Sequence, residues 1–497
     1  VDNSHYLKGM AVYSDDIPEG YDVVFNTNKK SGTPKMKVLK PIKDDPDNPF
    51  GASIKANGQS TYIGEDGKEH LSPINKLKEE GDWDTMAKNL SSQFLSKQPL
   101  KLLKQQLDLT IADRKAEYDE IMQYDNPTIR KKLLLDFADT CEGNSMTLKA
   151  SSFPGQATKV ILPLSKIGER ECYCPTYPDG TQLALVRFPH AGTFEIPIVT
   201  VNNKNLSGRR NLGNVQDAIG INAKVAERLS GADFDGDTVV AIPKSSKVDI
   251  KSTPALKDLK AFDPKIAYAV PEGNPNGVRL MKKEEKQKEM GIISNLITDM
   301  TLRGAPEGDI ARAVKHSMVV IDAEKHKLDY KRSERENGIQ ELKQKWEIRV
   351  QEDGTEKYGG ASTLLSRRKQ TVRVPERKGS ARIDKETGEK IYKESGRTYI
   401  DPKTGKRVQA MTEVSLISMH PNARDLSSGT IQENYYADFS NELKALANQA
   451  RKEAVNMKGI QKSPDAAEKY RAEVESINAK LNAVIGNKPK ERRATII

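Results

Sequence analysis

The sequence is poor in cysteine, in tryptophan and in long apolar runs. It contains 3 Cys and 2 Trp. Cys141, Cys172 and Cys174 include no C-x-x-C pair, which excludes a disulfide framework and a zinc knuckle and makes a reducing cytoplasm the expected compartment. No apolar run approaches the roughly 20 residues of a membrane span, and no secretory signal is visible. We therefore expect no membrane partner.

Charge is the feature that the chain has in excess. Its 80 Lys and Arg against 70 Asp and Glu give a net charge of +10, and the pI is near 9.1. Such a balance favours an anionic partner, of which nucleic acid is the usual one for a basic protein. The 497 residues suffice for roughly two to four domains, and the first residue, Val1, indicates a processed product or a piece of a longer protein.

Periodicity and turn residues divide the chain into six segments and predict an α+β protein. We expect a β-rich segment at 1–75, a helical layer at 76–145, short strands at 146–245, a helical region at 246–346, a basic hairpin-rich region at 347–425 and a C-terminal helical domain at 426–497. The close-spaced short strands of the third segment suggest a small closed barrel.

Two turns in the basic hairpin-rich region have the same pattern. Asp384–Lys390 and Asp401–Arg407 both place a glycine where a hairpin turn needs positive φ. Basic hairpins of this kind can follow a phosphate backbone or can be ordinary surface, and the sequence leaves both readings open.

Three carboxylates at Asp233, Asp235 and Asp237 carry the clearest chemical signal. Alternate residues of an extended chain point the same way, and a bend at Gly236 would let the three carboxylates turn toward one point. Three like charges so close repel one another unless a cation lies between them. Carboxylate oxygens are the ligands that Mg²⁺ prefers, so the loop predicts a metal site.

Other readings of this acidic loop fit less well or remain open. Counted from Asp233, an EF-hand loop would need Gly where Thr238 stands and Glu where Lys244 stands, so that reading fails. A phosphatase of the Asp-x-Asp-Gly-Thr type would need a buried apolar strand before the loop, and residues 226–232 are not one. A solvated acidic turn stays an alternative.

The loop and its flanks resemble the two-barrel RNA polymerases. Ser230–Asp237 is similar to the Ser-Gly-x-Asp-x-Asp-Gly-Asp segment of the cell-encoded polymerases of RNA silencing, and the loop also resembles that of the largest subunit of cellular RNA polymerases. Leu185–His190 resembles the Arg-x-Pro segment that precedes the family's metal loop. Gly291–Asn295 and Ser317–Lys325 resemble two later segments of the silencing branch.

This resemblance implies a double-psi β-barrel at 146–245 as the catalytic core. In the family, the three aspartates of the loop hold the catalytic Mg²⁺, for which Mn²⁺ can substitute, and the arginine approaches the ribose of the incoming nucleotide. Carried over by motif, the metal ligands and catalytic residues would be Asp233, Asp235 and Asp237, and the ribose contact would be Arg187.

The family also has a second barrel with lysines facing the triphosphate, and here only the N-terminal segment could supply it, in whole or in part. Asn48–Lys55 resembles a lysine-bearing strand of that barrel, which makes Lys55 a candidate triphosphate ligand. Thr412–His420 follows the residue order of the mobile trigger loop of cellular polymerases, which makes His420 a candidate substrate ligand. A lone surface histidine is the alternative reading there.

The resulting expectation is a single-chain, Mg²⁺-dependent RNA polymerase of phage or prophage type. Its partners would be NTPs, a DNA or RNA template with DNA favoured, the RNA product, and other phage proteins or an upstream segment. It would act in the cytoplasm of a bacterial host or be packaged in a virion. Two alternatives stay open: a polymerase-derived barrel that binds nucleic acid without catalysis, and an Asp-cluster metal hydrolase or nuclease.

Overall fold

The computed structural model describes two compact units, each assembled from separate stretches of the chain. The described residues are 4–6, 19–21, 39–42, 54–63, 67–77, 89–164, 166–188, 190–229, 232, 234, 236–259, 262–350, 353–402, 404–458, 464–481 and 483. The first unit comprises residues 1–89, 155–282 and 314–330, and the second comprises 90–154, 283–313 and 331–497. Among the helices of the described residues, none combines the length and the apolar character of a membrane span.

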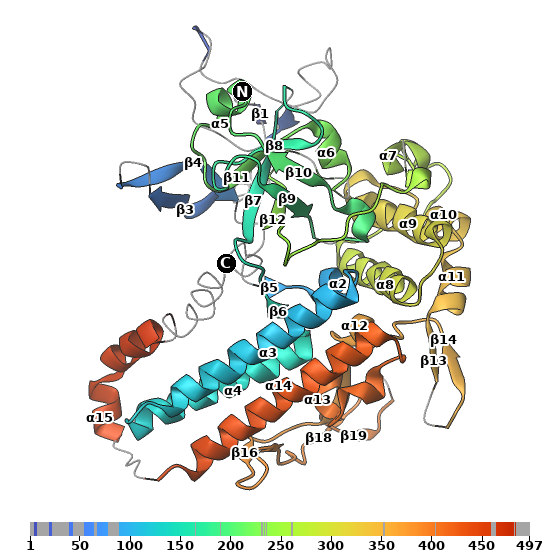
Figure 1. Cartoon of the computed structure of the whole chain (residues 1–497). Coiled ribbons are helices and arrows are strands. Elements are labelled where there is room, and N and C mark those ends of the chain that lie inside the picture. The colour runs from blue at the N-terminus through green and yellow to red at the C-terminus, as the bar shows by residue number, and fades with distance from the viewer. Residues whose placement is uncertain are drawn as a thin grey trace. The chain divides into compact units, whose positions relative to one another are not determined.

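A closed six-stranded barrel forms the centre of the first unit (Figure 1). Its strand order is β10-β8-β11-β7-β12-β9. The strands are β7 (Ala157–Pro163), β8 (Glu171–Tyr173), β9 (Gln182–Val186), β10 (Ile198–Val201), β11 (Ala218–Ile221) and β12 (Thr238–Pro243). The mixed α+β class predicted from the sequence is therefore confirmed, together with a closed barrel of short strands.

The strand pairing repeats after three strands. β7 pairs in parallel with β11 and antiparallel with β12. In the same way, β10 pairs in parallel with β8 and antiparallel with β9. The antiparallel pairs β8–β11 and β9–β12 close the barrel and map onto themselves under this exchange. The barrel thus has an internal pseudo-twofold relation between β7–β9 and β10–β12. In each half one strand pairs in parallel with a strand of the other half, β8 with β10 and β11 with β7.

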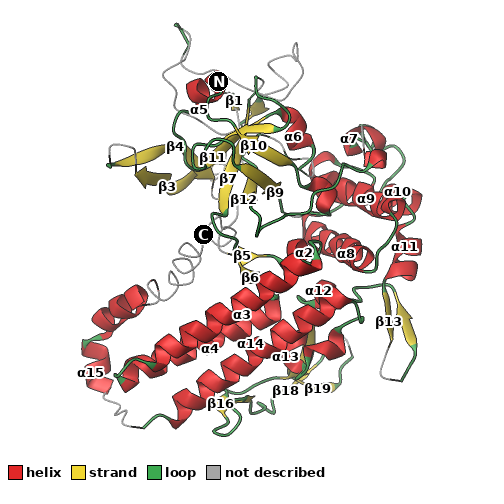
Figure 2. Cartoon of the chain, viewed as in Figure 1, coloured by secondary structure: helices red, strands yellow, loops and turns green. Residues whose placement is uncertain are grey.

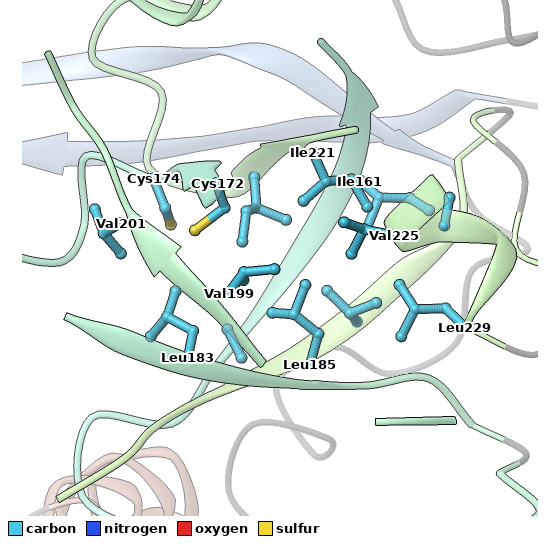
Figure 3. Close-up of a cluster of buried hydrophobic side chains, with 14 of the residues drawn as sticks. Ile161, Cys172, Cys174, Leu183, Leu185, Val199, Val201, Ile221, Val225 and Leu229 are labelled. Atoms are coloured by element: carbon cyan, nitrogen blue, oxygen red, sulfur yellow. The ribbon is translucent and has the colours of Figure 1, made fainter. Parts of the chain in front are cut away.

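Alternating side chains of the strands fill the barrel interior (Figure 3). Burying these apolar side chains supplies the main stabilisation of the barrel, at roughly 25 cal/mol per Å² of apolar surface. The interior cluster consists of Ile161, Cys172, Cys174, Tyr177, Leu183, Leu185, Val199, Val201, Ile219, Ile221, Val225, Ala226, Leu229, Ala232, Val239 and Ala241. Residues of β7 that point outward pack beneath α5 (Leu206–Leu212).

The N-terminal segment is described only in part. Its described strands form two antiparallel pairs, β1 (His5–Tyr6) with β2 (Lys40–Pro41), and β3 (Ile54–Ile63) with β4 (Glu69–Leu77). Much of 1–75 lies outside the described residues, so the second, lysine-bearing barrel stays a prediction.

Helices dominate the second unit (Figure 2). Three long ones, α3 (Leu100–Met122), α4 (Pro127–Thr147) and α14 (Ile431–Asn456), pack side by side. The side chain of Asn126 caps α4, and Pro127 occupies its first turn. The remaining main helices are α2 (Ser92–Leu95), α8 (Lys283–Leu302), α9 (Glu307–His326), α10 (Tyr330–Glu336), α11 (Ile339–Trp346), α12 (Leu364–Arg367), α13 (Leu416–Met419) and α15 (Pro464–Lys469), of which α9 extends into the stretch assigned to the first unit.

Between α12 and α13 the chain forms a ribbon and two hairpins. The ribbon pairs β15 (Thr371–Pro375) with β20 (Met411–Ser415). The first hairpin pairs β16 (Arg382–Ile383) with β17 (Lys390–Ile391), and the second pairs β18 (Thr398–Ile400) with β19 (Arg407–Gln409). A further hairpin, β13 (Ile348–Val350) with β14 (Glu356–Tyr358), precedes them.

The two turns that share a sequence pattern also share a conformation. In each, the backbone amide of the glycine donates to the carbonyl of the aspartate four residues earlier, and φ is +76° at Gly388 and +66° at Gly405. A Cβ at Gly388 would lie 1.8 Å from the carbonyl oxygen of Asn448 in α14, so only glycine fits there. The predicted repeat of one turn is confirmed.

Candidate active site

The acidic loop is anchored to the barrel through the residues between its aspartates. Ala232 is 7% exposed and belongs to the barrel interior, and the half-buried ring of Phe234 packs against the same cluster. Gly236 is buried with φ +123°, a backbone conformation that side chains rarely adopt. The bend predicted at Gly236 is therefore present, and the alternate residues of the loop face the barrel core.

Asp237 and Arg187 form an ion pair where two neighbouring strands meet the loop. The Nη2 atom of Arg187 lies 3.1 Å from each of the two carboxylate oxygens of Asp237. Their side chains are 19% and 24% exposed, respectively. Because the pair is neither buried nor fully solvated, both groups can reach a ligand while water screens them only in part. The structure thus brings together two residues that the sequence marks 50 positions apart.

The barrel strands fix this pair. Arg187 directly follows β9 and Asp237 directly precedes β12, and these strands are antiparallel neighbours with Val186 opposite Val240. The carbonyl of Asp237 also accepts a hydrogen bond from the amide of Ile161 in β7, at 3.0 Å. A site held by three paired strands keeps its geometry better than one carried by a free loop.

Arg228 supports the helix that leads into the loop, and no motif in the sequence marks it. It ends α6 (Ala223–Glu227), a helix that the side chain of Asn222 caps. Its guanidinium donates to the carbonyl of Phe194 at 3.2 Å, to the Ser252 hydroxyl at 2.9 Å and to the carbonyl of Thr253. Burial lowers the pKa of Arg228. These bonds join α6 to the segments that follow β9 and β12.

Two of the three predicted metal ligands, Asp233 and Asp235, lie outside the described residues. Among the residues that are described, no group of three His, Cys, Asp or Glu side chains could hold a metal ion. Because the predicted site includes Asp233 and Asp235, its metal binding stays a prediction. Asp237 is the predicted ligand whose surroundings are described.

The two remaining candidates are Lys55, of which only the backbone is described, and His420, which lies in the second unit. Lys55 is part of β3, and its side chain lies outside the described residues. His420 directly follows α13 in the second unit and is half-buried. Its carbonyl accepts a hydrogen bond at 2.7 Å from Lys444 of α14, whose pKa is lowered by burial. The segment around His420 is therefore tied to α14, and the substrate roles of Lys55 and His420 stay predictions.

Comparison with known proteins yields only distant structural similarity. No described protein family and no curated protein matches the sequence. A solved structure of the RNA-dependent RNA polymerase QDE-1 from Thielavia terrestris aligns with a TM-score of 0.38 and 13% sequence identity over 55% of this chain and 40% of that chain. The chain thus spans less than half the length of that polymerase, and at this TM-score the similarity assigns no activity to it.

Proposed function

We propose that the chain is a Mg²⁺-dependent RNA polymerase of the two-barrel class, which adds NTPs to an RNA 3′ end on a nucleic-acid template. The observation that carries this proposal is the ion pair of Arg187 and Asp237 at the ends of adjacent barrel strands. The two residues come from the two most specific motifs that resemble the family. An acidic turn without function would not require this partner from a second motif.

We further propose that the barrel is of the double-psi type. The supporting observation is the pairing pattern, in which β11 lies between the antiparallel strands β7 and β8, and β8 lies between the antiparallel strands β10 and β11. Two such interlocked crossings related by a pseudo-twofold are what the term double-psi denotes. The Asp loop enters β12, the last strand of this pattern.

The residues around the loop fit a divalent cation. Asp237 offers a partly exposed carboxylate, and the loop's Ala232 and Phe234 are committed to the core. Asp233 and Asp235 would join Asp237 as ligands in this proposal. A bound Mg²⁺ would lower the pKa of the primer 3′-hydroxyl and neutralise charge that builds up on the transferred phosphate.

Arg187 would have two tasks in this site. Its contact with both oxygens of Asp237 holds that carboxylate in one orientation, which limits the number of conformations that the site can sample. Its guanidinium would also donate to a ribose 2′-hydroxyl, which would favour ribonucleotides over deoxyribonucleotides.

Primer extension with Asp235→Ala and Asp237→Asn tests the proposal. The wild type should extend an RNA primer on a DNA or an RNA template with Mg²⁺ and NTPs, and each variant should lose at least about a hundredfold in rate, because each removes a ligand of the proposed ion. Asp249→Asn is the matched control, since Asp249 follows β12 with a side chain 81% exposed and pairs with Lys244. Its rate should equal that of the wild type.

Three results would contradict the proposal. They are absence of templated synthesis by the wild type, full activity of the Asp235→Ala protein at unchanged thermal stability, and loss of activity in Asp249→Asn. Degradation of the nucleic acid without NTPs would point instead to a metal-dependent nuclease.

A further inference from the structure

The first hairpin, formed by β16 and β17 in the second unit, has one face directed toward α4. Lys390 forms ion pairs with Asp139 and Glu142 of α4. On the same face, the guanidinium of Arg377 lies 3.6 Å from the centroid of the Tyr392 ring. Because side chains alternate along a strand, the odd-numbered residues of β17 and its continuation point to the opposite face.

That outer face gathers three cations around an exposed isoleucine. Arg382 pairs directly with Ile391, and the amide of Lys378 donates to the carbonyl of Lys393 at 2.8 Å, so the four residues share one side of the hairpin. All four are exposed, Ile391 by 46%. Within the described residues, none of the three cations forms an ion pair.

Two acidic residues of the same region, Glu376 and Asp384, are held by internal contacts. Glu376 accepts two hydrogen bonds from the guanidinium of Arg397. Asp384 accepts the amides of Glu386 and Thr387 inside its turn. Residues 376–410 contain 10 Lys and Arg against 6 Asp and Glu, so the region as a whole has an excess of positive charge.

The second hairpin adds exposed apolar and aromatic surface beside further cations. Tyr399 is 43% exposed and Ile400 is 64% exposed. Arg407 lies directly opposite Ile400, so these two share one face of the hairpin, and Tyr399 with its partner Val408 lies on the other. The two hairpins are joined, since the amide of Glu376 donates to the carbonyl of Ala410, whose own amide donates to the carbonyl of Arg397.

We propose that these two hairpins form a binding surface for single-stranded nucleic acid, distinct from the acidic loop. The cations would neutralise successive phosphates, and the ring of Tyr399 would stack on an unpaired base. A duplex keeps its base faces covered by their neighbours and would gain nothing from the tyrosine. An acidic protein partner would use the same cations but has no flat base to stack. The surface does not depend on the function proposed for the barrel, because it needs neither metal nor NTP.

The test is fluorescence anisotropy of the full chain with a labelled single-stranded 20-mer of deoxythymidine, in EDTA and without NTPs. The triple variant Lys378→Gln, Arg382→Gln, Lys393→Gln should weaken binding at least about tenfold and should reduce the slope of log K against log salt by about 2, at roughly 0.7 per lost phosphate contact. Tyr399→Leu should weaken binding about fivefold or more, whereas Tyr399→Phe should retain it because the ring remains.

The matched control removes the same charge elsewhere in the second unit. Lys101→Gln, Lys283→Gln, Lys288→Gln changes three exposed lysines of α3 and α8 and should leave affinity and salt slope nearly unchanged. Equal losses in both triple variants would overturn the proposal in favour of non-specific attraction. An unchanged affinity in the hairpin triple variant, or a Tyr399→Leu effect no larger than that on a blunt 20-base-pair duplex, would overturn it too. Because EDTA removes Mg²⁺, failure of primer extension leaves this result unaffected.

Discussion

The two units bury different kinds of side chain. The interior of the barrel in the first unit is a continuous apolar cluster, and the ion pair of Arg187 and Asp237 lies partly exposed beside the ends of two of its strands. The second unit instead buries three carboxylates, Asp299, Glu347 and Glu433, each no more than 1% exposed. Buried carboxylates are tolerated only where hydrogen bonds satisfy them. Among the described residues, the cluster inside the barrel contains no carboxylate, whereas the second unit uses buried carboxylates to hold its own backbone.

The buried carboxylates meet at the start of α12. Asp299 accepts hydrogen bonds from Ser362 and from the Thr363 hydroxyl, and Glu433 of α14 accepts the amide of Leu364. Burial raises the pKa of Asp299, and it raises the pKa of Glu347 from 4.5 to about 7. We therefore expect the free energy of unfolding of the second unit to change more with pH than that of the barrel. We also expect it to fall more when one buried hydrogen-bond acceptor is removed.

The largest expected effect is that of Glu433→Ala. The change removes the acceptor of the buried Leu364 amide and of three partly buried donors, namely the Ser428 amide, the Ser428 hydroxyl and the Thr430 hydroxyl. We expect the free energy of unfolding of the second unit to fall by about 4 kcal/mol. Glu433→Gln keeps one acceptor oxygen and should cost less than half as much.

Tryptophan fluorescence can follow this change in the second unit alone. In a Trp83→Phe background the only indole is that of Trp346 at the end of α11, and urea unfolding monitored there reports on this unit. Equal losses in the alanine and glutamine variants would mean that side-chain volume, and not the hydrogen bonds, matters at this position.

The next effect is a pH dependence that Glu347 should give to the second unit. Its pKa is higher in the folded state than the ordinary 4.5, so its contribution to stability is complete below about pH 4.5 and is lost as the pH rises through about 7. Glu347→Gln cannot ionise. Relative to the wild type, this variant should therefore gain on the order of 3 kcal/mol between pH 4.5 and pH 8, measured by urea unfolding at the Trp346 signal.

A barrel variant provides the contrast. Leu185→Ala opens a cavity in the apolar interior and should lower stability by about 3 kcal/mol by the same amount at pH 5 and pH 8. The buried thiols of Cys172 and Cys174 report barrel opening through their reactivity in a Cys141→Ala background. A pH-dependent loss in the barrel, or a pH-independent one for Glu347→Gln, would remove the distinction between the two units.

Sequence reasoning reached those parts of the molecule that local patterns encode. The cap and proline at Asn126 and Pro127, the glycine turns at Gly388 and Gly405, and the bend at Gly236 follow from local backbone preferences. The motifs also marked Arg187 and Asp237, which the fold brings into contact.

Long-range pairing and buried polar groups were not visible in the sequence. Strand β11 is Ala-Ile-Gly-Ile, too short and too rich in small residues to read as a strand, and it becomes one because β7 and β8 flank it. Likewise, Glu347 and Glu433 look like ordinary helix-surface glutamates until the chain segments that bury them have packed. Nothing in single-sequence periodicity distinguishes a buried carboxylate with partners from an exposed one.

The smallest expected change in stability, and the sharpest test of the barrel's role, is Gly236→Ala. With φ at +123°, an alanine there should cost about 1 to 2 kcal/mol of barrel stability, read from the thiol reactivity of Cys172 and Cys174. Gly180→Ala is the matched control, because Gly180 has φ +83°, has open space around its Cβ position and lies in the turn between β8 and β9. Both variants should lose similar stability, but only Gly236→Ala should slow primer extension, by about a hundredfold, because it displaces Asp237 beside Arg187. If both variants, or neither, lost activity, the conformation at Gly236 would be a feature of the fold and not of the site.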